Sequence, residues 1–218
     1  MALNKLKFNS INVTPSANEA LKFNSSANGF ETGSAGGAMT FIKKLTASSS
    51  SALSFVDGSS DVVLDNTYKE YIFHFNNIHP ATDNVYFTVG FRDGSTDYDA
   101  TKTTSFFRAY HLEDDSGTAL EYRAAEDLAQ ATGFQRLTEG TGSDSDQSCS
   151  GCLHLFNPSS TTFLKHFIAS INSSHAANLS ENNFIAGYCN VTAAIDAVQF
   201  KMSSGNIDSG DIVLYGIN

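Results

Sequence analysis

Apolar and polar residues alternate with a period of two along much of the chain, the pattern of β-strands whose two faces meet different surroundings. The alternation is clearest where Tyr71, Phe73 and Phe75 share one face while Ile72 and His74 share the other. Because both faces carry apolar side chains, this strand is predicted to be central in its sheet and covered on each face.

Further runs with the strand pattern occupy residues 85–90, 103–110, 153–156, 163–168 and 184–188. Phe and Tyr are plentiful, at 17 and 8 residues, and the turns between the runs are rich in Ser, Thr, Asn and Gly. The predicted fold is therefore all-β, a jelly-roll-like β-sandwich of roughly eight strands preceded by a short extended N-terminal arm.

The chain ends in two apolar runs, residues 194–202 and residues 207–217, separated by a polar segment that contains Gly205 and Asn206. Two strand patterns on either side of a short polar loop predict a β-hairpin. This hairpin is expected to close the sandwich.

One segment has two open interpretations. Residues 119–130 are rich in helix formers, and Leu120, Ala124 and Leu128 are spaced by four residues. The segment stops at Gly133 and lies among strands. It is predicted to be either a helix or an edge strand with a bulge.

The N-terminal part of the chain contains a repeat. The sequence Leu-Lys-Phe-Asn-Ser at residues 6–10 recurs word for word at residues 21–25, and each copy alternates as a strand does. Pro15 supplies a turn between the copies. Residues 28–37 have the composition of a flexible connector. We therefore expect an arm that ends near residue 38.

The arm, residues 1–38, is followed by the predicted sandwich domain at residues 39–218. Two strands with so few apolar residues are marginal in water, so the arm needs the main domain, other copies of itself or a partner to cover it. Its apolar side chains form the predicted anchoring and oligomerisation site: Leu6, Phe8, Ile11, Val13, Leu21 and Phe23. Pairing of repeated short strands between copies predicts a homotrimer.

The charge balance narrows the range of partners. The chain has 13 Lys and Arg against 23 Asp and Glu, a net charge of −10, which argues against binding to nucleic-acid phosphates. No stretch approaches the roughly 18 consecutive apolar residues of a membrane span. The first residues lack the apolar core of a signal peptide. We expect no nucleic acid and no membrane insertion.

Two clusters invite a metal hypothesis. Cys149 and Cys152 have zinc-ligand spacing, but with Cys189 they make an odd number and no second paired motif is present. Asp144 and Asp146 resemble the start of a calcium loop that lacks its Gly and terminal Glu. Free thiols and a solvated loop are the preferred interpretations, and no cofactor is expected.

No motif for catalysis stands out in the chain. A nucleophile in a strained elbow, a zinc-binding helix motif and a glycine-rich phosphate loop are all missing from the sequence. The protein is therefore predicted not to be an enzyme.

Several stretches carry a family resemblance: residues 198–210 with 214–217, 68–73 with 77–83, 107–111, and 153–163 with 165–168. Together they resemble the small virion proteins of tailed bacteriophages, especially marine ones, which are tail-fibre, head-fibre or other structural components. The resemblance runs through about residues 39 to 218. It implies a part of the virion.

This resemblance implies a short fibre or a decoration of the capsid or tail, held by the arm, with the sandwich facing outward for virion stabilisation or host attachment. Expected partners are other virion proteins and, through Ser-, Thr- and Asn-rich loops, host-surface glycans. Two alternatives remain open. One is a lectin-like host-recognition module, and the other is a polysaccharide-degrading enzyme, for which Asp144 and Asp146 are the residues to test.

Overall fold

The computed structural model describes residues 13–14, 20–33 and 37–217. Contacts divide the chain into two compact units, Met1–Ala38 and Met39–Asn218, and each is described by itself. The described residues form strands, turns and bends and contain no helix, which confirms the all-β prediction. The anchoring role expected of the first unit stays a prediction.

The first unit contains β1 (Ala20–Phe23) and β2 (Phe30–Gly33). The second contains β3 (Met39–Thr46), β4 (Leu53–Val56), β5 (Glu70–Pro80), β6 (Phe87–Arg92), β7 (Lys102–Leu112), β8 (Thr118–Tyr122), β9 (Gln135–Arg136), β10 (Cys149–Phe156), β11 (Lys165–His175), β12 (Leu179–Cys189), β13 (Ala197–Met202) and β14 (Ile207–Ile217).

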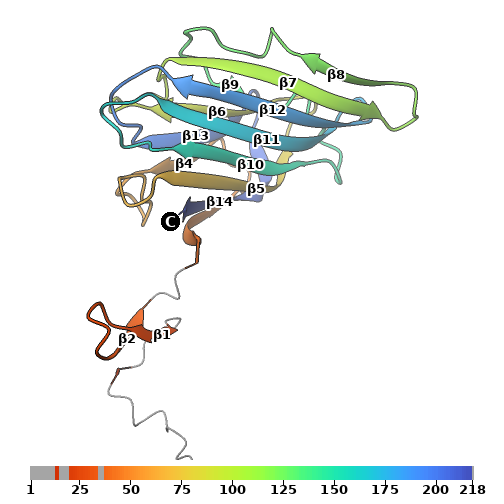
Figure 1. Cartoon of the computed structure of the whole chain (residues 1–218). Coiled ribbons are helices and arrows are strands. Elements are labelled where there is room, and N and C mark those ends of the chain that lie inside the picture. The colour runs from red at the N-terminus through yellow and green to blue at the C-terminus, as the bar shows by residue number, and fades with distance from the viewer. Residues whose placement is uncertain (1–12, 15–19, 34–36, 218) are drawn as a thin grey trace, which may run out of the picture. The chain divides into compact units, whose positions relative to one another are not determined.

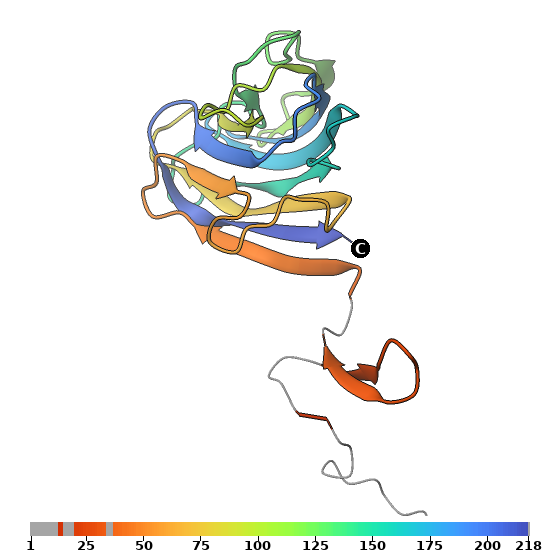
Figure 2. The same cartoon turned by 90° about the vertical axis from the view of Figure 1, so that its left-hand side faces the viewer.

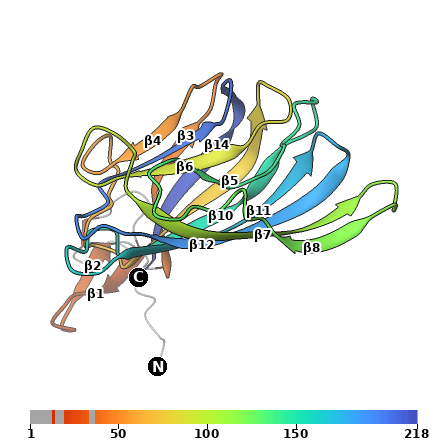
Figure 3. The same cartoon turned by 90° about the horizontal axis from the view of Figure 1, so that it is seen from above.

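The second unit is a sandwich of two antiparallel sheets, as predicted. The larger sheet has eight strands in the order β3-β14-β5-β10-β11-β12-β7-β8, and the smaller has four in the order β4-β13-β6-β9. Figure 1 shows the larger sheet in front with the smaller one behind it. Seen from above, the strands of the larger sheet fan round in a curve (Figure 3). The described residues thus hold more strands than the roughly eight expected.

The closing hairpin predicted from the last two apolar runs is wrong. β13 pairs with β4 and β6 in the smaller sheet, whereas β14 pairs with β3 and β5 in the larger one. Figure 2 shows β14, in blue, beside β3, in orange. The polar segment at residues 203–206 therefore carries the chain from one sheet to the other. Alternation assigns faces to a strand but does not select its partner.

An aromatic core joins the two sheets. Phe73 and Phe75 of β5 meet Phe200 of β13 at ring-centroid distances of 5.3 and 5.1 Å, and Phe87 of β6 lies 5.1 Å from Phe75. All four side chains are buried. Such ring pairs contribute about 0.5–1.5 kcal/mol each beyond the burial of their apolar area. These contacts make β5 and β13 the centre of the fold.

The two faces of β5 differ more than the sequence indicated. Tyr71, Phe73 and Phe75 point into the sandwich and are fully buried, whereas Ile72 and His74 lie on the opposite face. No second sheet covers that face in the described part of the chain. Ile72 is nevertheless only 7% exposed, because the neighbouring strands carry large side chains on both sides of it. The prediction of cover on each face is corrected accordingly.

The segment with two interpretations is an edge strand rather than a helix. Residues 118–122 form β8, which pairs with β7 at the edge of the larger sheet. Turns follow at residues 124–126, after the N–H of Arg123 donates to the carbonyl of Phe106. The hydrogen bonds offered by β7 therefore outweigh the helix propensity of the segment.

Candidate functional site

The first unit presents an amphipathic hairpin. β1 and β2 pair antiparallel with Phe23 opposite Phe30, and the two rings stack with centroids 4.9 Å apart. Phe23 is 67% exposed and Phe30 48% exposed, and Leu21 shares their face. On the other face Lys22 and Glu31 form an exposed ion pair with 3.5 Å between Nζ and Oε1. We call the side with Leu21, Phe23 and Phe30 the hairpin apolar face.

The predicted anchoring residues have different outcomes. Leu21 and Phe23 come together on the hairpin apolar face, as their alternation indicates. Val13 is half-buried and belongs to no strand. Leu6, Phe8 and Ile11 lie outside the described residues, and so does Pro15, the predicted turn.

The sequence missed Phe30 as a member of this site. Residues 28–37 were expected to be a connector, but Phe30–Gly33 forms β2 and pairs with the second copy of the repeat. The connector prediction is therefore wrong over these residues. The alternation of Phe30, Glu31 and Thr32 was the available signal, and the surrounding Gly and Ser residues masked it.

A second candidate surface is the outer face of the larger sheet, which is the face turned away from the smaller sheet. The paired residues of one row across it are Tyr122, Phe107, Phe184, Ser170, Cys152, His74 and Val213. Phe107 and Phe184 stack with ring centroids 4.9 Å apart, and Phe107 is 40% exposed. This face therefore offers aromatic surface to a partner.

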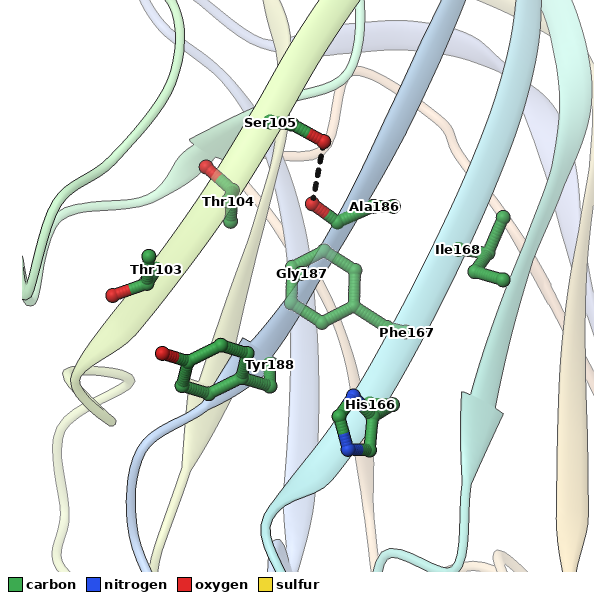
Figure 4. A pocket seen from close by; sticks show the side chains of 9 residues that line it. All are labelled: Thr103, Thr104, Ser105, His166, Phe167, Ile168, Ala186, Gly187 and Tyr188. Carbon is green, nitrogen blue, oxygen red and sulfur yellow. Dashed lines mark hydrogen bonds between the residues drawn. The ribbon is translucent and has the colours of Figure 1, made fainter.

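The outer face is hollowed where β7, β12 and β11 lie side by side (Figure 4). The hollow has a volume of about 550 Å³ and nine lining residues: Thr103, Thr104, Ser105, His166, Phe167, Ile168, Ala186, Gly187 and Tyr188. We call it the outer-face depression. Its centre is low because β12 carries only the small side chain of Ala186 on the outer face there, between Ser105 of β7 and Ile168 of β11.

Polar groups stand around the outer-face depression. His166 of β11 and Tyr188 of β12 are paired neighbours, and their rings are tilted by 60° with centroids 5.9 Å apart. Thr103 Oγ1 accepts hydrogen bonds from the N–H and the side-chain amide of Gln130, at 3.2 and 2.6 Å, so its own hydroxyl hydrogen is used by neither.

The acidic loop singled out in the sequence lies elsewhere, between β9 and β10. Asp144 and Asp146 are exposed, and Asp146 lines a polar hollow of about 490 Å³ with His79 and Asp208. His79 Nδ1 lies 2.6 Å from the carbonyl oxygen of Gln147. The described residues include no group of three or more His, Cys, Asp or Glu that could hold a metal ion. The described residues around Asp144 and Asp146 therefore do not support the calcium interpretation.

The two closely spaced cysteines point to opposite faces of β10. Cys149 is buried in the core, whereas Cys152 is half-buried on the outer face with His154. Burial raises the pKa of the Cys149 thiol well above its ordinary range and that of Cys189 to about 12. All three cysteines are free thiols. Cys149 and Cys152 point to opposite faces of β10, so this arrangement does not support the zinc interpretation.

A cluster of charges is buried at the β7–β8 end of the sandwich. Arg108 bridges Glu121 and Glu139 at 2.8 Å each and Glu181 at 3.2 Å. Burial raises the pKa of Glu181 above its usual value. The remaining members of this arginine–glutamate cluster are Arg123, Glu126 and Arg136. The sequence carries no local signal for it, because its members come from β7, β8, β9, β12 and two loops.

Each Glu of the cluster has an arginine partner and Arg108 is only 13% exposed, so the cluster is a structural clamp rather than a site open to substrate.

Of the described residues, none belongs to a helix with the length and apolarity needed to cross a membrane.

Comparison of the chain with protein-family models, with curated proteins and with solved structures gives no match. The family resemblance noted in the sequence therefore stays a prediction.

Proposed function

We propose that this protein is a non-enzymatic structural component of a tailed-bacteriophage virion, either a short fibre or a decoration of the capsid or tail. Its first unit attaches it to the particle, and its sandwich is displayed for stabilisation of the virion or attachment to the host. The observation that carries the proposal is the hairpin apolar face, which the described residues of the first unit leave uncovered.

The hairpin apolar face demands a partner on physical grounds. A two-stranded hairpin is marginally stable in water, and here Leu21, Phe23 and Phe30 are between 46% and 67% exposed. An exposed group of large apolar side chains on a small element marks an interaction site. The polar face, with Lys22 and Glu31, suits contact with water. The hairpin therefore has one side for a partner and one for solvent.

The second unit supports a different role. Its core between the two sheets is complete, with Phe55, Phe73 and Phe200 fully buried and in ring contact. A unit with a closed core of its own can be carried as a rigid display module. The first unit has an exposed apolar face that needs a partner, whereas the second unit buries its own core. This difference supports a protein that is attached through its first unit.

The proposed oligomer is a homotrimer. Three hairpins can cover one another's apolar faces around a common axis, and residues 6–10 repeat the sequence of residues 21–25 in each chain. A closed ring of identical contacts ends the assembly at a fixed number of copies. The trimer is then held by other virion proteins.

Deleting residues 1–38 tests the proposal. Particles assembled with the shortened protein are purified, and its copy number is measured by quantitative mass spectrometry. Circular dichroism on the shortened protein checks that the β-sandwich still folds. The proposal expects a folded protein that is lost from the particles. Full occupancy of the particles by the shortened protein would refute it.

A further inference from the structure

We propose that the outer-face depression binds one ring of a neutral saccharide. This inference deepens the proposed attachment role and rests on it, since it names the class of host-surface molecule that the displayed sandwich meets. The sequence pointed to polar loops for such contacts. The depression instead lies on three neighbouring strands, β7, β12 and β11 (Figure 4).

The shape of the depression suits a small flat ligand. Ala186 forms its floor, with Ser105 paired on one side and Ile168 on the other. Thr103, Tyr188 and His166 form the neighbouring row. Adjacent strands lie about 4.8 Å apart, so three of them give a shelf about 10 Å wide. The volume of about 550 Å³ is within the range of small-molecule sites.

The chemistry of the lining matches the two kinds of surface on a sugar ring. A pyranose presents C–H groups on its faces and hydroxyl groups on its rim. The side chains of Ala186 and Ile168 offer apolar contact to a ring face, and Ile168 is 52% exposed. The lining is mostly apolar, and the Tyr188 hydroxyl and the His166 nitrogens supply the polar groups for hydrogen bonds to the rim.

Charge selects a neutral ligand. No Asp, Glu, Lys or Arg lines the outer-face depression, and all its lining residues belong to the described part of the chain. A carboxylate or ammonium group on the sugar would lose hydration on entry and find no opposite charge. The net charge of −10 further disfavours acidic saccharides.

Size separates a saccharide from a protein partner. A stable protein–protein interface uses about 20–30 residues on each side. The depression has nine lining residues. A few hydrogen bonds and one apolar contact instead suit a weak site, with a dissociation constant of about 1 mM. Several copies on a particle would strengthen such a site through multivalency.

The test is an NMR titration of the full-length protein. The probes are the neutral methyl glycosides of glucose, galactose, mannose and N-acetylglucosamine, with glucuronic acid and glucosamine as charged comparisons. We expect at least one neutral glycoside to shift the resonances of Tyr188 and His166. Ala186→Leu, which fills the floor, should weaken that binding about tenfold or more.

Two further variants locate the site. Ala109→Leu adds the same side chain to the outer face of β7 outside the depression, and it should leave binding unchanged. Tyr188→Phe keeps the ring and removes one hydroxyl, so it should weaken binding severalfold. The inference is overturned if no neutral glycoside binds at about 50 mM, which is far above the expected constant. It is equally overturned if only charged sugars bind or if Ala186→Leu has no effect.

The saccharide site and the proposed function are refuted by different measurements. Glycoside binding is measured on the isolated protein, whereas attachment to the virion is measured as copies per particle. An arm that anchors the protein, together with a depression that binds no sugar, would overturn the saccharide site alone.

Discussion

The buried carboxylate of Glu181 accepts a hydrogen bond from the backbone N–H of Glu139, with 2.9 Å between Oε1 and N. The two residues are 42 positions apart, one on β12 and the other in the loop between β9 and β10. Arg108 bonds to both carboxylates, so the loop is clamped to the larger sheet by charge-assisted hydrogen bonds. The stability of this end of the sandwich depends on that clamp.

Arg108→Met is therefore expected to destabilise the protein by about 3–5 kcal/mol, because it leaves Glu181 buried without its cation. The free energy of unfolding in urea measures the effect. Lys44→Met is the matched control, since Lys44 pairs with Asp211 at the surface and is 51% exposed. That change should cost about 0–1 kcal/mol. Equal losses in the two variants would contradict the clamp.

His175 gives the stability a dependence on pH. Burial, followed by repulsion from Arg108, lowers the pKa of His175 below its ordinary value of 6.5. The unfolded chain then binds a proton more readily than the folded one as the pH falls through 6.5, so stability is lost on acidification and retained above that pH. His175→Asn should flatten the unfolding free energy between about pH 5 and 7. An unchanged slope would show that His175 is not responsible.

Gly210 occupies a position that other residues cannot take. Its φ is +116°, and a Cβ there would lie 2.5 Å from the carbonyl oxygen of Asn77, at an irregularity in the pairing of β14 with β5. Gly210→Ala should cost at least about 1–3 kcal/mol, measured by thermal unfolding. Gly133→Ala is the control, because a Cβ at Gly133 meets nothing within 4 Å. A harmless Gly210→Ala would contradict the geometry at this bulge.

The proposed homotrimer predicts a mass in solution. Sedimentation equilibrium of the full-length protein should give three times the chain mass of 23.4 kDa. Replacing Phe23 and Phe30 by Ser should return the monomer mass, because the contact between copies uses the hairpin apolar face. A trimer that survives this double change would show that its contacts lie elsewhere.

Local alternation predicted the faces of strands well. Phe73 and Phe75 lie on one face and Ile72 lies on the other, as sequence parity predicts. Successive side chains of a strand point to opposite faces, so the face of one residue fixes the faces of all the others. The assignment of β13 and β14 to different sheets was out of reach. Pairing partners such as Leu214 with Phe73 are far apart in sequence, and many strands share the same alternating pattern.

The candidate sites were predicted less completely. Leu21 and Phe23 belong to a visible repeat, so two of the three residues of the hairpin apolar face were found, whereas Phe30 is surrounded by Gly and Ser residues that masked it. The outer-face depression had no local signal. It arises because Ala186 on β12 lies between Ser105 of β7 and Ile168 of β11, and only the register brings these residues together.

The central claim is that the hairpin apolar face, by joining the copies into a trimer, lets the first unit hold the protein on the virion. The most direct test is the number of copies per purified particle, measured by quantitative mass spectrometry, for Phe23→Ser with Phe30→Ser. Lys22→Ser with Glu31→Ser is the matched control, because it changes the opposite face of the same hairpin. We predict loss of the first variant from the particles and normal occupancy by the second. Normal occupancy by both variants would contradict the claim.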